Sequence, residues 1–549
     1  MPSLWQGHRR AILLIVGLAL FWSIGLGDVP LFDWDEVNFA ECSREMRATG
    51  QYLYAQIGFL PFWEKPPLFF WLQSLSMELW GENAFGARFP NVLIAALTLW
   101  ILYRIGRRWH DESFGLIWLF LYAISLLPSF YARSGLIDPL FNLFMLLSTV
   151  QGTLFLIKGK ILNAGGMGFF AGLATLTKGP VGLLMPGLAV GTLAVLLRRF
   201  RSIGMLGVWG GLFYLGIVGG WIALIAAQCQ TRLLEDFWAY QWRLFATPDA
   251  GHGGPWYYHL VVVAAGMFPA SFWALPGGRD LSPAQEPMPT AVVLLSLWSL
   301  LIFSIVKTKI LHYSSLSYYG VAYLGARAWH GRADWIQRQG WLMVGVATML
   351  LGMLTILAAP LMSRSDLWLS WIQDAFVRMA IVETPILWEG WEGWTGFILL
   401  GGISVLYLGR FPSRVRLYLL GVMLAVWQSL TLAVWAPRIE AYSQGPLREF
   451  AQQCAAEGAV LWALGFKSYI PYFYGRMQPE TSPRQEKDVI AFQNLILMGK
   501  ASFPAYLVVR GDRFQESLLR EYRLKIVERR GAYVFLQHEE NHSGQALFP

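Results

Sequence analysis

The chain has 549 residues, of which 55% are hydrophobic and only 14% are charged, whereas soluble domains carry roughly 25% charged residues. This composition predicts a membrane protein that is long enough for a bundle of spans and a separate soluble part. The net charge is +8, and the Lys and Arg residues lie in short clusters between apolar runs. This distribution argues against nucleic acid as a partner. The three cysteines form no CxxC pair and no zinc spacing.

Long apolar stretches recur along the chain and, at about 20 residues per span, predict a polytopic bundle of about thirteen transmembrane helices. The expected spans are 11–27, 89–106, 113–131, 139–157, 163–177, 180–197, 204–228, 257–275, 289–306, 311–328, 341–360, 394–409 and 416–436. Lys and Arg clusters fall on alternate connections, which places the N-terminus in the cytoplasm and the C-terminus outside.

Two parts are expected, a transmembrane part over residues 1–436 and a soluble part over 437–549. The first outer loop, about 28–88, contains two stretches that favour amphipathic helices lying along the membrane interface. In the C-terminal part, short apolar runs at 459–464 and 505–509 and on both sides of Arg530-Gly531 predict strands. They alternate with helical stretches, which indicates a small α/β domain outside the membrane.

The first outer loop begins with an acidic group, Asp33, Asp35 and Glu36, close to the bilayer surface. Carboxylates there could act as a general base or as ligands for a divalent ion beside a phosphate. Capping of the helix that follows is the structural alternative.

Further along this loop stands the sequence Glu64-Lys65-Pro66-Pro67. Its two prolines stiffen the backbone and hold residue 65 extended, so Lys65 suits a point contact with phosphate. A surface ion pair before a helix start is the structural alternative.

Asp138-Pro139 follows Arg133 and opens a predicted span from its outer end. An Asp-Pro pair is a usual helix start, but an aspartate near bilayer depth is also a functional candidate. A further set of residues maps to the outer side and could hold an anionic lipid head group: Lys178, Arg243, His252, Lys307, Lys309, His312 and Tyr313. Each of them alone could instead be an interfacial side chain. The sequence has no GxGxxG after a strand, no GxxxxGK[ST] and no HExxH, so a nucleotide-sugar site has no support.

Taken in order, DWDEVNFAECSREM, FWEKPPLFFWLQSLSMELWGENAFGARFPN, ARSGLIDPL and KTKILHYSSL resemble the successive motifs of the GT-C glycosyltransferases. The resemblance covers about the first 330 residues and is to the branch of the protein O-mannosyltransferases and the bacterial lipid A aminoarabinose transferases. It implies an integral membrane enzyme that transfers a sugar, with inversion, from a polyprenyl-phosphate carrier to an acceptor.

The resemblance also implies roles for single residues. Asp35 matches the catalytic carboxylate of the first loop, with Glu36 beside it, and Asp138 matches a second acidic position. Glu64 and Lys65 match the pair near the carrier phosphate, and Glu64 is the expected ligand if a divalent cation takes part. The other residues expected to bind substrate are Arg133, Lys178, Arg243, His252, Lys307, His312 and Tyr313.

The implied setting is the bacterial cytoplasmic membrane, with the site on the periplasmic side. The acceptor stays open among lipid A, another glycolipid and a protein hydroxyl. The alternative functions are a secondary transporter and a lipid-binding protein without transferase activity. Against a transporter, no repeat relates the two halves and the charges gather at one interface rather than mid-span.

Overall fold

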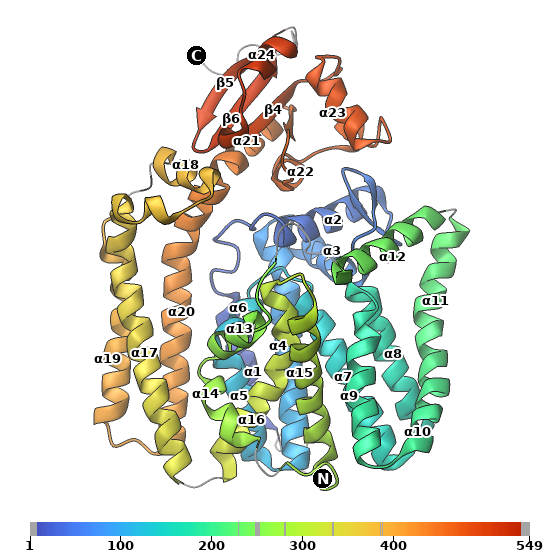
Figure 1. The fold of residues 1–549 in the computed structure, drawn as a ribbon, viewed down its shortest axis with the longest axis vertical. Coiled ribbons are helices and arrows are strands. Elements are labelled where there is room, and N and C mark those ends of the chain that lie inside the picture. The colour runs from blue at the N-terminus through green and yellow to red at the C-terminus, as the bar shows by residue number, and fades with distance from the viewer. Residues whose placement is uncertain are drawn as a thin grey trace.

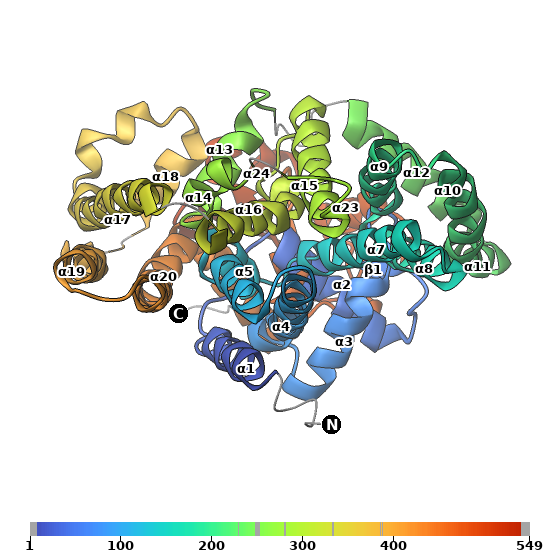
Figure 2. The same cartoon turned by 90° about the horizontal axis from the view of Figure 1, so that it is seen from below.

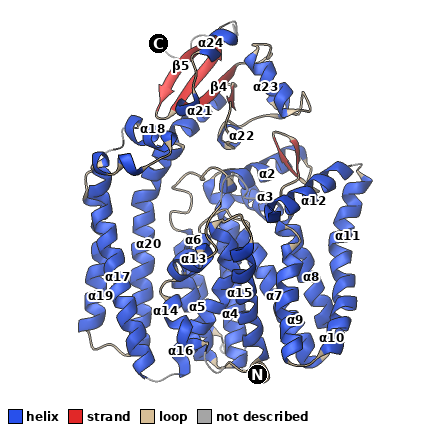
Figure 3. Ribbon diagram, viewed as in Figure 1, coloured by secondary structure: helices blue, strands red, loops and turns tan. Residues whose placement is uncertain are grey.

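The computed structural model describes residues 8–228, 230–246, 253–278, 281–331, 334–384, 386 and 388–539. Long helices stand side by side, α2 and α3 lie across their upper ends, and a small sheet stands above (Figure 1). Figure 2 shows the helices from below, and Figure 3 shows that helix dominates while strands are confined to the upper part. The predicted fold class, a helical bundle with a small C-terminal α/β part, is confirmed.

The helices of the bundle cover the predicted apolar stretches. They are α1 Arg9–Ser23, α4 Ala84–Trp109, α5 Glu112–Ile124, α6 Leu126–Tyr131, α7 Asp138–Lys158, α8 Ile161–Lys178, α9 Val181–Leu196, α10 Phe200–Met205, α11 Gly211–Ala227, α13 Tyr258–Gly266, α14 Ala270–Gly277, α15 Pro287–Ile305, α16 Tyr318–Gly331, α17 Asp334–Ser363, α19 Thr395–Leu408 and α20 Ser413–Ser443. The first outer loop supplies α2 Asp35–Thr49, the hairpin β1 Ala55–Ile57 with β2 Leu60–Phe62, and α3 Leu68–Trp80. Two further helices are α12 Thr231–Ala246 and α18 Ala375–Glu383.

Not every predicted span is one straight helix. The stretch 113–131 breaks at Ser125 between α5 and α6, and 257–275 is bent by 112° between α13 and α14. Within the described residues, 6 helices are long and apolar enough to cross a membrane, or 7 if the bent pair is one span. The predicted count of about thirteen, which assumed about 20 residues per span, is therefore not confirmed.

The N-terminus lies at the lower end of the bundle, far from the sheet (Figure 1). One hollow there is lined by His8, Arg104, Arg107, Arg108 and Lys158. These residues come from different predicted cytoplasmic connections, so their meeting agrees with the grouping that the positive-inside rule requires.

The C-terminal region, Gly445–His538, is built on a four-stranded sheet of order β3-β4-β6-β5. Its elements are α21 Gly445–Ala456, β3 Val460–Ala463, α22 Ile470–Phe473, α23 Val489–Leu497, β4 Ala505–Arg510, α24 Ser517–Glu521, β5 Leu524–Arg530 and β6 Tyr533–His538. β3 is parallel to β4, and the other pairs are antiparallel. All four predicted strands are present.

Both faces of this sheet are covered by apolar residues of other elements. Successive side chains of a strand point to opposite faces, so neighbouring residues of β3 belong to different cores. Val460 and Trp462 of β3 pack with Phe492 of α23, whereas Leu461 between them belongs to the core that includes Val37 and Ala40 of α2. The C-terminal region therefore shares an apolar core with the first outer loop.

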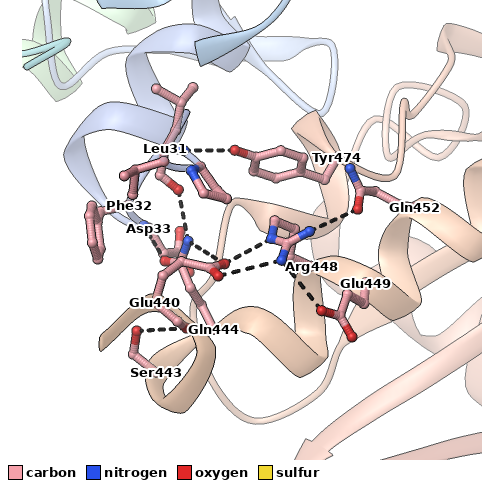
Figure 4. A network of polar contacts seen from close by, with 12 residues as sticks. Leu31, Phe32, Asp33, Glu440, Ser443, Gln444, Arg448, Glu449, Gln452 and Tyr474 are labelled. Carbon is pink, nitrogen blue, oxygen red and sulfur yellow. Dashed lines mark hydrogen bonds and ion pairs between the residues drawn. The ribbon is translucent and has the colours of Figure 1, made fainter. Parts of the chain in front are cut away.

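Hydrogen bonds also connect the C-terminal residues with the first outer loop, just before α2 (Figure 4). Gln444 accepts a bond from the backbone N–H of Asp33 at 2.7 Å and donates to the carbonyl of Leu31 at 2.8 Å. The N–H of Leu31 donates to the hydroxyl of Tyr474 at 2.8 Å. Arg448 pairs with Glu440 at 2.8 Å within this network. Residues 31–33 thus have a fixed path below the sheet.

On the bundle side, the same segment is held by a buried ion pair. Arg88 of α4 donates two bonds to the Glu36 carboxylate, at 2.9 and 2.7 Å, and others to loop carbonyls. Glu36 also accepts from the N–H of Gly135, just before α7, at 2.7 Å. Burial alone would raise the pKa of Glu36, but Arg88 and the backbone donors hold it below its usual value. One carboxylate thus joins α2, α4 and the start of α7.

Replacement of Arg88 by alanine should destabilise the fold, because Glu36 would be left buried without its cation. Loss of one partner of a buried pair costs about 3–5 kcal/mol. The control is Arg364→Ala, because Arg364 and its partner Asp366 are both exposed and such pairs contribute about 0–1 kcal/mol. Thermal unfolding in detergent should show a much larger decrease for Arg88→Ala, and equal decreases would contradict this role.

Candidate functional site

A cavity of about 160 Å³ opens near the upper ends of α7, α8 and α15. Its polar residues are Lys65, Asp138, Asn142, Lys178, Gln241 and Tyr313. Its apolar lining consists of Phe141, Met145, Val181, Leu184, Ile302, Phe303, Val306 and Leu316. The cavity therefore has a charged part beside an apolar part, as a ligand with an anionic head and a hydrocarbon tail requires.

Two carboxylates, Asp138 of the cavity lining and Asp35 beside it, lie close to the same histidine. Nε2 of His312 lies 3.7 Å from an oxygen of Asp35 and 3.7 Å from an oxygen of Asp138. Asp35 begins α2 and Asp138 begins α7, so both lie at helix N-termini, where a negative charge is favourable. Asp35 is 43% exposed and Asp138 only 4%, so Asp35 is the carboxylate that a substrate from solution can reach.

Asp138 is also paired with a cation. Nζ of Lys178, at the end of α8, lies 2.5 Å from Oδ1 of Asp138 and 5.0 Å from the ring centroid of Tyr313. Among the described residues, Oδ2 of Asp138 has no hydrogen-bond partner. This oxygen is buried and lies 3.7 Å from Nε2 of His312, so the Asp138 carboxylate connects Lys178 with His312.

Lys65 reaches the cavity from the first outer loop. Its Nζ lies 5.2 Å from the ring centroid of Tyr240, and the Arg243 guanidinium lies 5.2 Å from the same ring. Tyr240 and Arg243 belong to α12, so this helix brings a second cation to the Lys65 side of the site. The position of two cations beside an apolar lining suits a lipid-linked phosphate.

A buried acid fixes the hairpin that leads to Lys65. The Glu45 carboxyl of α2 accepts bonds from the N–H groups of Gly58 and Phe59, each at 2.7 Å. Burial, and next the neighbouring Glu41, raise the pKa of Glu45 well above its usual value. Gly58 adopts its positive φ of 62° without cost, but Phe59 has φ of 58°, which residues with a Cβ rarely adopt. The two bonds help to hold Phe59 in this turn.

Glu64 does not join the carboxylates of the cavity. Its nearest charged partner is Lys467 of the C-terminal region, at 3.4 Å. Among the described residues, no group of three or more His, Cys, Asp and Glu side chains could hold a metal ion. The described surroundings of Glu64 thus do not form a ligand set for the divalent ion that the sequence associates with it.

Three other predicted site residues lie elsewhere, and a fourth cannot be placed. Glu36 is bound to Arg88 and does not line the cavity. Arg133 packs its guanidinium 4.8 Å from the Phe21 ring of α1. Lys307 is exposed and is not part of the cavity lining. His252 lies outside the described residues.

The cavity also contains residues that the sequence analysis missed. Asn142 follows Asp138 by one helical turn and donates to the Ser315 hydroxyl at 2.7 Å. Its i+4 spacing from Asp138 was a usable signal, because such residues share a helix face. Gln241 gave no local signal, since its place in the cavity depends on distant contacts.

Comparison with known proteins adds to this geometry. Residues 64–227 match the family model described as dolichyl-phosphate-mannose-protein mannosyltransferase. The chain is 28% identical over 314 residues to an undecaprenyl phosphate-alpha-4-amino-4-deoxy-L-arabinose arabinosyl transferase of Pectobacterium carotovorum, and this match covers 55% of the chain and 56% of that relative. A relative of the same name from Pseudomonas aeruginosa is 29% identical over 311 residues, with the same shares of both chains. The chain thus spans little more than half the length of the curated relatives that it matches.

The fold comparison covers nearly the whole chain. The crystal structure of ArnT from Cupriavidus metallidurans bound to undecaprenyl phosphate matches with a TM-score of 0.76 and 19% identity, over 97% of this chain and 99% of that one. The apo structure of the same protein matches with a TM-score of 0.75 and 20% identity, over 96% and 97%. The chain therefore has the GT-C fold. The sequence matches cover part of the chain and are to proteins of the branch that the motifs resemble.

Proposed function

We propose that this chain is a membrane glycosyltransferase that takes a sugar from a polyprenyl-phosphate donor and transfers it to an acceptor on the side of the C-terminal region. The observation that carries the proposal is the cavity in which Lys65, Asp138 and Lys178 lie beside an apolar lining. Next to it, His312 connects Asp138 with the more exposed carboxylate of Asp35. The matched relatives, which are named as transferases of a polyprenyl-linked sugar, support the proposal. They do not favour the transporter or the non-catalytic lipid-binding alternative.

The donor is assigned to the cavity by its two chemical parts. The isoprenoid tail would lie against Phe141, Met145 and the other apolar lining residues, because contact between apolar surfaces removes both from water. The phosphate would bind Lys65, with Lys178 as the second cation of the cavity. Fixed cations at this place would stabilise the negative charge that grows on the phosphate as it leaves.

Asp35 is proposed to act on the acceptor. The acceptor oxygen would attack the anomeric carbon of the donor, and the bond from that carbon to the phosphate oxygen would break with inversion. The polyprenyl phosphate leaves with the bonding electrons. If the acceptor is a hydroxyl, its proton passes to Asp35 as general base; if it is a phosphate, Asp35 only orients it.

The donor sugar and the acceptor class are proposed by comparison with the relatives. Their names make 4-amino-4-deoxy-L-arabinose the first donor sugar to test. Lipid A, another glycolipid and a protein hydroxyl are the acceptor classes to compare. The apolar helices and the basic lower end suit the bacterial cytoplasmic membrane, with the site on its periplasmic side.

Asp35→Asn should reduce sugar transfer by at least about 100-fold, because a general base contributes 10²–10⁴ in rate. Donor binding should stay nearly unchanged. Transfer is measured with purified enzyme, a polyprenyl-phosphate sugar and extracted glycolipid as acceptor. Asp28→Asn is the control, because Asp28 is an exposed carboxylate of the same loop and does not line the cavity. Normal transfer by Asp35→Asn would remove Asp35 from this role.

Lys65→Ala should weaken binding of undecaprenyl phosphate by about 10-fold to 100-fold, the loss expected for a hydrogen bond to a charged group. Binding is measured in detergent by displacement of a labelled lipid. Lys160→Ala is the control, because Lys160 is exposed in the turn between α7 and α8. An affinity equal to that of the control variant would show that Lys65 does not hold the phosphate.

Leu184→Trp should fill part of the apolar lining and weaken undecaprenyl phosphate binding by about tenfold, within the range that overpacking costs. Leu183→Trp is a close control, because Leu183 is the adjacent residue of α9, is 39% exposed compared with 46% for Leu184, and does not line the cavity. The same loss of affinity in both variants would place the isoprenoid tail elsewhere.

A further inference from the structure

A basic hollow of about 560 Å³ lies at the lower end of the bundle, where α4 and α7 end. Its polar lining consists of cations and one histidine: Arg104, Arg107 and Arg108 of α4, Lys158 of α7, and His8 just before α1. In the described part of the chain, no Asp or Glu is among its lining residues. Arginine and lysine side chains of two helices therefore surround one space.

The local sequence places these cations at helix ends. Arg104 and Arg108 are four residues apart on α4, so they lie on the same face of that helix. Arg107 and Arg108 belong to the last turn of α4, and Lys158 belongs to the last turn of α7. A cation is favourable there, because the C-terminal end of a helix carries a partial negative charge. The helix dipoles explain each cation alone, but they do not explain why cations of two helices meet around an open hollow.

The positive charge of the basic hollow also acts on its histidine. Nη1 of Arg107 lies 2.6 Å from Nδ1 of His8, and since a guanidinium can only donate, this nitrogen accepts. Partial burial, followed by Arg107 and Arg104, lowers the pKa of His8, whereas Glu112 acts in the opposite direction. Glu112 itself does not line the hollow. The arginines and the lysine thus set the charge of the hollow, and this charge attracts an anion.

The rest of the lining is apolar. It consists of Ile105 and Trp109 of α4, Val150 and Leu154 of α7, and Met288 of α15. A free anion gains nothing from such a surface, because only the removal of apolar groups from water is favourable there. A lipid can instead place its phosphate among the cations and a chain against the apolar side chains, as the long stems of Arg and Lys at helix ends permit.

The basic hollow and the cavity of the candidate site lie at opposite ends of α7. Asp138 begins this helix and lines the cavity, whereas Lys158 ends it and lines the hollow. At about 1.5 Å per residue, the 21 residues of α7 span about 30 Å, which is close to the thickness of the hydrocarbon core of a bilayer. The hollow is therefore at the head-group level of the leaflet opposite to the cavity.

We propose that the basic hollow binds an anionic phospholipid of this opposite leaflet. Its phosphate would lie among Arg104, Arg108 and Lys158, and an acyl chain would pack against Val150 and Leu154. Basic pockets between transmembrane helices on the cytoplasmic side are a known type of site for phosphate-bearing lipid head groups. Because α4 and α7 both supply cations, a bound lipid would join these helices and stabilise the folded protein. The hollow contains none of the residues assigned to sugar transfer, so the lipid site would exist whether or not the proposed function is correct.

Lipid binding to the purified, delipidated protein in neutral detergent tests this site, with cardiolipin and phosphatidylcholine as probes. Both lipids carry phosphodiesters, but the choline group of phosphatidylcholine cancels the negative charge. Cardiolipin should bind the wild-type protein at least about tenfold more tightly than phosphatidylcholine. Arg104→Gln/Arg108→Gln should weaken cardiolipin binding by about 10-fold to 100-fold, because charge-assisted contacts are lost. Lys158→Gln, on the other helix, should also weaken it, and native mass spectrometry measures these affinities.

The matched control is Arg199→Gln/Arg201→Gln. It removes the same charge from two exposed arginines at the start of α10, at the same lower end of the bundle (Figure 1). Neither arginine lines the hollow, so the cardiolipin affinity of this variant should equal that of the wild-type protein. Cardiolipin should raise the unfolding temperature of the wild-type protein and of the control, and it should raise that of Arg104→Gln/Arg108→Gln much less.

Three results would overturn the lipid site. Equal losses of affinity in the two double variants would mean that cardiolipin responds only to the overall charge of this face. Equal affinities of the wild-type protein for cardiolipin and phosphatidylcholine would mean that the cations do not select an anionic lipid. Displacement of cardiolipin by inorganic phosphate at a similar concentration would mean that the hollow binds a free anion and makes no use of its apolar lining.

Discussion

The fixed path of residues 31–36 is the constraint on which the rest of the site depends. Below it, Glu36 is bound by Arg88 and by the N–H of Gly135. Above it, Gln444 and Ser468 hold Leu31 and Asp33. Asp35 lies between these two attachments, so its direction toward His312 is set by contacts that it does not make itself. Because Gly135 is three residues before Asp138, the Glu36 carboxylate also fixes the distance between the two acidic positions.

The donor and the acceptor of the proposed reaction can approach the site from different parts of the structure. The cavity is apolar where the bundle helices line it and charged where the first outer loop, α8 and α12 meet. A lipid donor can enter such a site from the membrane while its phosphate remains among cations. The C-terminal region approaches the other side of the same loop and shares an apolar core with α2. We therefore interpret this region as part of the site and not as a separate attachment.

The sequence predicts local features of this chain well. Apolar runs locate the helices, alternating short runs locate all four C-terminal strands, and the ordered motifs indicate the GT-C fold. Lys65, Asp138, Lys178 and Tyr313 line one cavity, and His312 connects Asp138 with Asp35 beside it. The breaks at Ser125 and between α13 and α14 were not predicted, since an apolar stretch looks the same whether it is straight or bent.

The sequence does not reveal which charges pair across long separations. Glu36 and Asp35 are adjacent, yet the partner of Glu36 is Arg88, a contact that depends on how α2 crosses α4. Lys467 and Glu64 are 403 residues apart, so no spacing rule connects them. Arg133 similarly looks like a site residue from its motif, but it packs on Phe21 because α6 ends beside α1. Local pattern predicts which residue types are present, whereas tertiary packing decides which of them act together.

A cryo-electron microscopy structure of the protein with undecaprenyl phosphate is the most direct measurement of the central claim. The account predicts phosphate density beside Lys65 and Lys178, with the isoprenoid tail against Phe141 and Met145 and with Asp35 facing the same space. Phosphate density away from both lysines, or a tail outside this cavity, would contradict it.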